Sequence, residues 1–303
     1  MLTLDALRKS RSLDFSSITK ALTKTTEGGF AKDDAEFFKI TRDKAGNGSA
    51  VIRFLDKTQG DELPFVQIYN HAFQGPSGRW YIENCLSTLG EDDPVNTANR
   101  VLWNGSEADK EIAKKQKRKL QYIANVYVVS DPGNRENEGK VLKFKFGKKI
   151  FEKITEKVQP TFEDDKPINV FDYWEGANFK FRVRQYEGYA NYDQSSFADP
   201  SALAETDEEI LVIANQQYKL GTLIARDQFK SYEELEKKFK SVMTAGPMQA
   251  RSGASELEEA AVAAKPVGKT IEAKPVKSKP APTAASSDAE ESDLEDYFTK
   301  LAG

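Results

Sequence analysis

The sequence of 303 residues has one cysteine and one histidine, and this scarcity excludes several kinds of site. One cysteine cannot form an intramolecular disulfide, and Cys85 with His71 cannot fill the four-ligand shell of a structural zinc ion. Nucleophilic catalysis of the Ser-His-Asp or Cys-His type has only His71 as its base. The sequence also lacks a GxxxxGKS or GxxxxGKT phosphate-binding loop and a dinucleotide-binding fingerprint. These absences predict a protein without enzymatic activity and without a cofactor.

Long apolar runs are also missing. None is long enough to span a bilayer, and the sequence after Met1 does not have the pattern of a signal peptide. We therefore expect a soluble protein that is not exported and does not bind membranes. With 39% hydrophobic and 11% aromatic residues, the chain can still build one sizeable core with tails, or two small domains.

The formal net charge of −4 hides an uneven distribution of charge along the chain. Basic residues cluster near Arg8, Lys117 and Lys148, whereas acidic residues crowd the C-terminus. The net value therefore does not exclude an anionic partner such as nucleic acid.

The most informative stretch is 114–151, where two aromatic-rich segments lie between two blocks of lysine and arginine. The segments 122–129 and 141–146 are predicted strands, and the turn residues of 130–139 connect them. Cations interleaved with flat rings suit an unpaired nucleic acid strand, because phosphates need positive charge and exposed bases stack on rings. The alternative is a half-buried sheet whose lysines solvate one face.

Alternation within the second of these strands favours the alternative for one ring. Side chains two residues apart share a face of a strand, so Leu142, Phe144 and Phe146 lie together and Lys143 and Lys145 lie opposite. The period alone therefore predicts that Phe144 is a core residue.

The rest of the chain up to residue 245 is predicted to be mixed β structure with helices. Short strands between Gly, Pro and Asn turns favour a small barrel or closed sheet over a βαβ array. Further strands are expected at 50–55, 65–73, 79–85, 169–173 and 178–185, helices at 148–157, 209–218 and 231–243, and irregular polar chain at 86–111.

A second place for bases to stack is predicted in the loop 186–197. It carries Tyr189 and Tyr192 beside few other apolar groups, close in sequence to Arg182 and Arg184. The alternative is that the two tyrosines cover the end of the barrel.

Both ends of the chain are predicted to extend from the core, which spans 31–245. Residues 1–30 form a basic arm with an amphipathic helix, which is either an ordinary solvated helix or a docking arm. Residues 246–284 are rich in Ala, Pro, Lys and Ser and predict a flexible linker. Residues 285–303 combine acidic and apolar side chains, which is typical of a disordered tail that binds partner proteins rather than one that only aids solubility.

Long motifs between residues 43 and 243 resemble the family of T-even-type bacteriophage single-stranded DNA-binding (helix-destabilising) proteins. The motifs are AGNGSAVIRFL, RWYIENCLSTLG, YIANVYVV, DPGNRENEGKVLKFKFGKKI, WEGANF and GYANYDQSSF, in that order. The resemblance implies an OB-fold-like small barrel that coats unpaired DNA cooperatively and destabilises duplex during phage replication, recombination and repair in the cytoplasm of the infected bacterial host. It also implies self-association through the arm, and binding of polymerase, helicase loader and recombinase through the tail.

The resemblance assigns roles to individual residues. The residues that match DNA-contacting positions, with Arg184 added because it lies beside the tyrosines, are Trp80, Arg118, Lys119, Tyr122, Phe144, Lys148, Lys149, Arg184, Tyr189 and Tyr192. The basic and hydroxyl residues expected in self-association are Arg8, Lys9, Ser10, Arg11 and Ser12. The expected partner-binding residues of the tail are Asp293, Leu294, Glu295, Asp296, Tyr297 and Phe298.

The zinc ligands are one point at which this sequence departs from the family. His71 and Cys85 match two ligands of the family's zinc site, but the expected Cys-x-x-Cys is replaced by DPVN at 93–96. A carboxylate of Glu91, Asp92 or Asp93 would be needed to complete a site. We expect the loop to fold without metal.

Two other functions are weaker alternatives. A metal-dependent nuclease would use the acidic clusters 163–165 or 207–209, which have no supporting ligands in the sequence. An RNA-binding regulator on the same fold is also possible in principle, because stacking does not distinguish the sugar.

Overall fold

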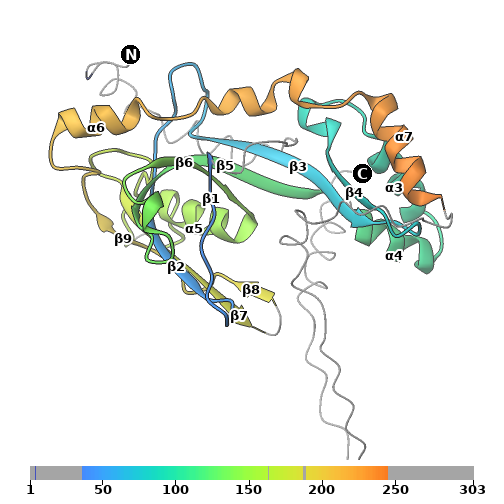
Figure 1. The fold of residues 1–303 in the computed structure, drawn as a ribbon, viewed down its shortest axis with the longest axis horizontal. Helices are drawn as coiled ribbons and strands as arrows, with labels where there is room; N and C mark the ends of the chain where they lie inside the picture. The colour runs from blue at the N-terminus through green and yellow to red at the C-terminus, as the bar shows by residue number, and fades with distance from the viewer. Residues whose placement is uncertain (1–3, 5–35, 163, 187–188, 245–303) are drawn as a thin grey trace, which may run out of the picture. The chain divides into compact units, whose positions relative to one another are not determined.

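The computed structural model describes residue 4 and residues 36–162, 164–186 and 189–244 (Figure 1). The predicted linker and acidic tail lie outside these residues, as does the predicted N-terminal arm apart from Leu4. Among the described helices, none combines the length and the hydropathy that crossing a membrane requires.

A mixed sheet forms the larger part of the fold. Its strands are β1 (Phe37–Phe38), β2 (Gly48–Phe54), β3 (Phe65–Gln74), β4 (Trp80–Asn84), β5 (Lys119–Ser130), β6 (Val141–Phe146), β7 (Ala177–Tyr186), β8 (Tyr189–Asn191) and β9 (Ser196–Pro200). The main order is β1-β6-β5-β2-β7-β8, with β3 beside β5, β4 beside β3 and β9 beside β7. Among the described strands, β1 pairs only with β6 and β8 pairs only with β7. The sheet therefore stays open, which differs from the predicted closed sheet.

Aromatic rings fill the core of this sheet. Phe54 of β2 is fully buried and packs against Phe144, Phe146, Phe171 and Phe179 at centroid distances of 5.6–6.2 Å. Helix α5 (Lys148–Val158) covers the core with its buried face, which carries Ile150, Phe151, Ile154 and Val158. Helix α6 (Asp207–Ala214) packs over a smaller cluster beside it.

Strands β3 and β5 run on beyond the main sheet into a second group of elements, which we call the helical lobe (Figure 1). It consists of β4, the far end of β3, and the helices α3 (Pro94–Trp103), α4 (Glu107–Gln116) and α7 (Tyr232–Met243). Phe73 and Tyr81 stack at 5.2 Å in its core, where Val95 and Val242 are also buried.

Three sequence predictions of secondary structure were wrong. The segment 86–111, predicted to be irregular, contains η2 (Leu86–Leu89), α3 and the first half of α4. Asp93 caps α3 in front of a proline, and Ser106 with Asp109 forms a capping box for α4. These caps define short helices whose apolar pattern is weak.

The other two errors concern turns and strands after α5. The segment 169–173, predicted to be a strand, is a turn region because Asn169 and Asp172 accept hydrogen bonds from backbone N–H groups two residues on. The predicted loop 186–197 contains β8 and the start of β9. The connections η3 (Arg135–Asn137), η4 (Leu220–Ile224) and η5 (Arg226–Gln228) complete the described elements.

Candidate nucleic-acid interface

The outer face of β7 presents a row of cations. Odd-numbered residues from Ala177 to Val183 are buried in the core, so Lys180, Arg182 and Arg184 point to the opposite, exposed face. Alternate residues of a strand lie about 6.6–6.8 Å apart. The strand thus holds three positive charges at regular spacing, with no acidic residue between them on β7.

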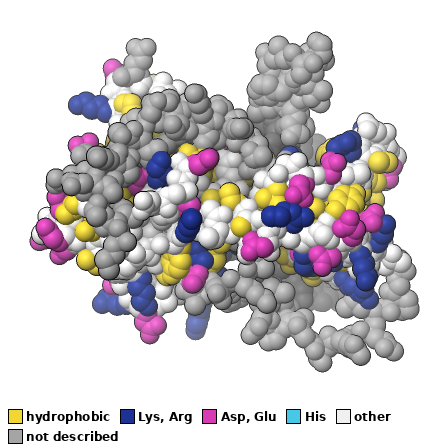
Figure 2. All heavy atoms as spheres, turned by 90° about the horizontal axis from the view of Figure 1, so that it is seen from above, with side chains coloured by type: hydrophobic (Ala, Val, Ile, Leu, Met, Phe, Trp, Pro, Cys, Tyr) yellow, Lys and Arg dark blue, Asp and Glu magenta, His cyan; other side chains and the backbone are white. Residues whose placement is uncertain are grey.

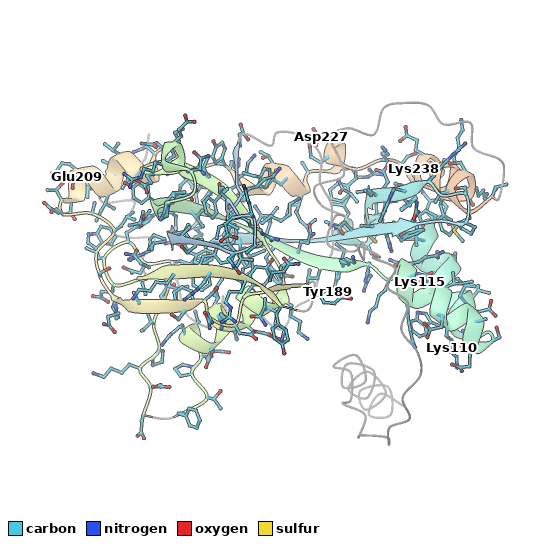
Figure 3. All side chains as sticks on the ribbon, turned by 60° about the horizontal axis from the view of Figure 1, so that its bottom comes forward. Lys110, Lys115, Tyr189, Glu209, Asp227 and Lys238 are labelled. Atoms are coloured by element: carbon cyan, nitrogen blue, oxygen red, sulfur yellow. The ribbon has the colours of Figure 1, made fainter. Side chains whose placement is uncertain are left out.

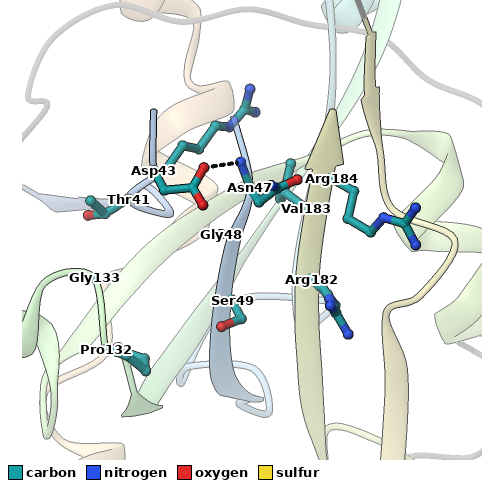
Figure 4. Close-up of a pocket in the computed structure, with 11 residues that line it drawn as sticks. Thr41, Asp43, Asn47, Gly48, Ser49, Pro132, Gly133, Arg182, Val183 and Arg184 are labelled. Atoms are coloured by element: carbon teal, nitrogen blue, oxygen red, sulfur yellow. Dashed lines mark hydrogen bonds between the residues drawn. The ribbon is translucent and has the colours of Figure 1, made fainter. Parts of the chain in front are cut away.

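An open groove runs beside this row (Figure 4). It has a volume of about 680 Å³, and Arg42, Arg182 and Arg184 contribute its cations. Its one carboxylate, Asp43, accepts hydrogen bonds of 2.9 Å from the backbone N–H groups of Ala45 and Asn47. Because three arginines face one carboxylate, the groove has a net positive charge.

A smaller hollow of about 260 Å³ continues the groove along β2 and β7. Both share Ser49, Pro132 and Arg182, and Lys180 lines the smaller one. The two hollows therefore form one continuous basic surface, which we call the β7 face and define by Arg42, Lys180, Arg182 and Arg184.

Two exposed rings lie at the end of the β7 face. Tyr186 is paired with Tyr189 across β7 and β8, and directly opposed residues project from the same side of a sheet. Their exposed fractions are 60% and 74%. Figure 3 shows Tyr189 at the free end of this hairpin. A row of cations can bind the phosphates of an unpaired nucleic acid, and exposed rings beside it can stack on the bases. The β7 face with Tyr186 and Tyr189 offers both.

Trp80 and Lys119 lie on one face of the sheet formed by β3, β4 and β5. Trp80 is opposite Gln74 and Lys119 is opposite Asn70, and these two β3 residues are four apart, so all four side chains share one face. Trp80 is 48% exposed and Lys119 is exposed. The predicted ring and cation are thus available on the outer side of the helical lobe.

Tyr122 and Phe144 lie in the core. Tyr122 stacks on Phe151 with ring centroids 3.8 Å apart and is 5% exposed, and Phe144 is 4% exposed. Neither ring has an open face for a base in this structure. The alternation within the strand correctly placed Phe144 in the core, and the DNA-binding role that the family resemblance gave to both rings remains a prediction without structural support.

Lys148 and Lys149 occupy the first turn of α5 and are exposed. Positive charge at a helix N-terminus is unfavourable, and this turn has no acidic residue and no side-chain cap. Lys153 of the same helix donates to the backbone oxygen of Asp193, which follows the half-buried Tyr192. The ring of Tyr192 stacks on Phe181 at 5.7 Å. Lys149 lies one turn before Lys153 on the same side of α5, whereas Lys148 pairs with Glu152 at 3.9 Å.

Arg118 is half-buried and fixed on two sides. Its guanidinium lies 4.3 Å from the centroid of the Tyr69 ring, and its Nη1 donates to Ser87 Oγ at 3.0 Å. Arg118 and Lys119 were predicted to act as one block, but only Lys119 is the exposed member of the pair.

A buried polar cluster lies behind Ser87, at the positions that correspond to the family's zinc site. His71 of β3, Cys85 after β4 and Asp93 before α3 are all buried, and their ligand-type atoms lie within 4.8 Å of one another. Of the three carboxylates considered from the sequence, the structure brings Asp93 to this place. Glu91 instead pairs with Arg226 at 3.0 Å.

Protonation of this cluster follows from its contacts. Nδ1 of His71 lies 2.8 Å from the carbonyl oxygen of Gln116, which can only accept, so Nδ1 carries a hydrogen. Nε2 lies 3.4 Å from Oδ1 of Asp93. Burial lowers the pKa of His71, but Asp93 and Cys85 outweigh it and raise the pKa to about 9. Burial raises the pKa of Asp93, but His71 and the backbone N–H groups of Leu86 and Asn96 outweigh it, so this pKa is lowered. Both pKa directions favour the charged form of the pair.

The face that carries α6 and α7 has a different character (Figure 2). Lysine and arginine side chains are interspersed there with aspartate and glutamate over the part that the structure describes. On α7, for example, Lys240 pairs with Glu236 at 2.8 Å. Such alternating charge does not favour a polyanion.

The sequence-based list included Arg184 and Tyr189 but missed Lys180, Arg182, Arg42 and Tyr186 as site residues. Lys180, Arg182 and Tyr186 could have been found from the alternation of FKFRVRQY, which puts every charge of the strand on one side. Arg42 reaches the groove from a loop, so its place depends on tertiary structure. The predicted self-association and partner-binding residues lie outside the described part of the chain.

Comparison with known proteins places this architecture among DNA-binding proteins of phages. A family model described as gp32 DNA binding protein like matches residues 46–243, which include β2 to β9. The single-stranded DNA-binding protein of Enterobacteria phage T2 is 41% identical over 229 residues, which are 73% of this chain and 74% of that protein. That of Enterobacteria phage T4 is 40% identical over 222 residues, with 71% and 72% covered. That of Escherichia phage SV14 is 48% identical over 78 residues, 26% of this chain and 68% of that protein.

Proposed function

Because the chain belongs to the family of gp32-like DNA-binding proteins, we propose that it binds single-stranded DNA and coats unpaired strands during phage replication, recombination and repair. The observation that carries this proposal is the β7 face, where evenly spaced cations lead to the open rings of Tyr186 and Tyr189. Backbone phosphates and bases are the groups that such a surface binds without reading sequence.

Binding is driven by the release of counterions from the strand. Each neutralised phosphate of a single strand contributes a slope of about −0.7 in the logarithm of affinity against the logarithm of salt. Bases that stack on Tyr186 and Tyr189 each add roughly 1–3 kcal/mol. Since only the unpaired state offers these ring contacts, binding destabilises duplex by mass action and needs no nucleotide hydrolysis.

The remaining exposed residues of the predicted site belong to the same proposal. Trp80 and Lys119 supply a ring and a charge on the helical lobe, and Lys148 and Lys149 supply charge at α5. We also propose that the main sheet is related to the OB-fold. Support comes from the mixed sheet with an exposed face, since OB-folds bind oligonucleotides across such a face.

Assembly and location complete the proposal. Residues 1–30 link neighbouring copies along DNA, and residues 285–303 bind replication and recombination proteins. Their basic and acidic compositions support these roles. The protein acts in the cytoplasm of the infected bacterium, where phage DNA is unpaired, and it has no nuclease activity. Release of cleaved single strands on incubation with magnesium would contradict that last point.

Competition binding tests the proposal. The full-length protein is titrated with single-stranded DNA, duplex DNA and single-stranded RNA of matched length. We expect single-stranded DNA to bind most tightly, and the Tyr186→Ala, Tyr189→Ala double variant to lose about tenfold or more in affinity. Phe162→Ala is the matched control, because this ring is 73% exposed and lies outside the β7 face. Equal loss in the control and the double variant, or tightest binding of RNA or duplex, would refute the proposal.

A further inference from the structure

The donor set around His71 and Cys85 decides whether zinc, which the family resemblance implies, fits this chain. Asp93 supplies a third group, but its oxygens already hold the start of α3. Oδ1 accepts from the backbone N–H groups of Val95 and Asn96 at 2.9 and 3.2 Å, and Oδ2 accepts from that of Leu86 at 3.2 Å.

The fourth position of the cluster is occupied by Asn96. Its Nδ2 donates to Ser87 Oγ at 2.7 Å and to Cys85 Sγ at 3.3 Å. An amide N–H group has no lone pair to give to a cation. The cluster therefore does not offer the four ligands of a structural zinc site, and hydrogen bonds join the same segments instead.

These hydrogen bonds continue to the protein surface through one hydroxyl. Ser87 Oγ lies 3.1 Å from Cys85 Sγ and accepts from both Asn96 and Arg118. The guanidinium of Arg118 is then held between this hydroxyl and the ring of Tyr69. An unsupported arginine side chain would sample many rotamers and lose entropy when it bound a phosphate.

We propose that the cluster of His71, Cys85, Asp93 and Asn96 holds the helical lobe together without zinc. The hydroxyl of Ser87 connects this cluster to Arg118 and fixes the orientation of the guanidinium for binding DNA, and we call this connection the relay. Ser87 is a positioning residue that does not itself touch the strand. The role given to Arg118 rests on the proposed function, whereas the metal-free cluster does not.

The metal content of the protein tests the first part of the proposal, that the cluster binds no zinc. The full-length protein is produced in zinc-supplemented medium and dialysed, and its zinc content and thermal midpoint are measured with and without a chelator. We expect far less than one zinc per chain and an unchanged midpoint. Stoichiometric zinc, or a midpoint that falls with the chelator, would overturn the metal-free cluster.

A double-mutant cycle tests the relay. We expect Ser87→Ala to weaken binding of a short single-stranded oligonucleotide by about threefold or more, but to have no further effect in an Arg118→Ala background. Ser87→Thr keeps the hydroxyl and should retain affinity. Thr88→Val is the matched control, because the Thr88 hydroxyl is buried without a hydrogen-bond partner among the described residues.

The outcomes separate the two proposals. If the wild-type protein does not bind the oligonucleotide, the proposed function fails while the metal result stands. If it binds, and Ser87→Ala either matches wild type or weakens both backgrounds equally, the relay is wrong. The thermal midpoint of each variant shows whether a loss of binding reflects unfolding.

Discussion

Raising the pH should weaken the helical lobe, because the ion pair of His71 and Asp93 is buried within it. The pKa of His71 is raised from 6.5 to about 9, so the folded protein holds this proton more tightly than the unfolded chain. The contribution to stability is complete below pH 6.5, declines above it and is lost as the pH passes about 9. At about 1.4 kcal/mol per pKa unit, the full contribution is about 3 kcal/mol.

Asp93→Asn tests this effect through its pH dependence, because the substitution removes the charge, and the hydrogen bond from Leu86 N–H that it also loses does not depend on pH. Asparagine caps a helix about as well as aspartate, so α3 keeps its N-cap while the charge is removed. Urea unfolding at several values between about pH 6 and pH 9, followed by tryptophan fluorescence, gives the free energy of unfolding of both proteins. The difference in the free energy of unfolding between the wild type and Asp93→Asn should become smaller as the pH rises. A difference that stays constant over this range would refute the ion pair as its source.

Three further predictions concern the core and the two ends. Phe144→Ala should lower the free energy of unfolding by about 3–5 kcal/mol, because it leaves a cavity among packed rings; urea unfolding measures this, and a cost below about 1 kcal/mol would contradict the core assignment. Deleting residues 1–20 should preserve affinity for a short oligonucleotide and abolish cooperative coating of a long one in an electrophoretic mobility assay; continued cooperative coating would exclude the arm. Deleting residues 285–303 should leave DNA affinity equal or increase it in the same titration, because an anionic competitor is removed, and weaker binding would count against this role.

Local patterns predicted the parts of the fold that depend on neighbours in sequence. The boundaries of β6 were predicted and are confirmed, and the helix predicted at 231–243 is α7, which begins with a capping box of Ser231 and Glu234. The core position of Phe144 followed from alternation alone. The helices α3 and α4 were missed, although Asp93 and Ser106 provide the caps that signal them.

Contacts between segments that are distant in the chain could not be predicted from the sequence. Arg42 reaches the groove beside β7 from a loop 140 residues earlier in the chain, and no local pattern specifies that approach. Similarly, alternation correctly placed Lys143 opposite Phe144 but could not show that it is buried there, where Glu36 and the rings of Phe37 and Tyr218 surround its ammonium group. Pairing of this kind is decided by tertiary packing, which can favour a buried charge once a partner is present.

The salt dependence of DNA binding tests the central claim most directly. Affinity for a single-stranded oligonucleotide is measured over a series of salt concentrations for wild type and for the Lys180→Ala, Arg182→Ala, Arg184→Ala triple variant. A triple variant of Lys219, Lys237 and Lys240 to alanine removes the same charge from the N-cap of η4 and from α7, and it serves as the control. If each β7 cation meets one phosphate, the slope should become shallower by about 2 in the first variant and stay close to wild type in the control. Equal slopes in the wild type and the β7 variant would contradict binding on the β7 face.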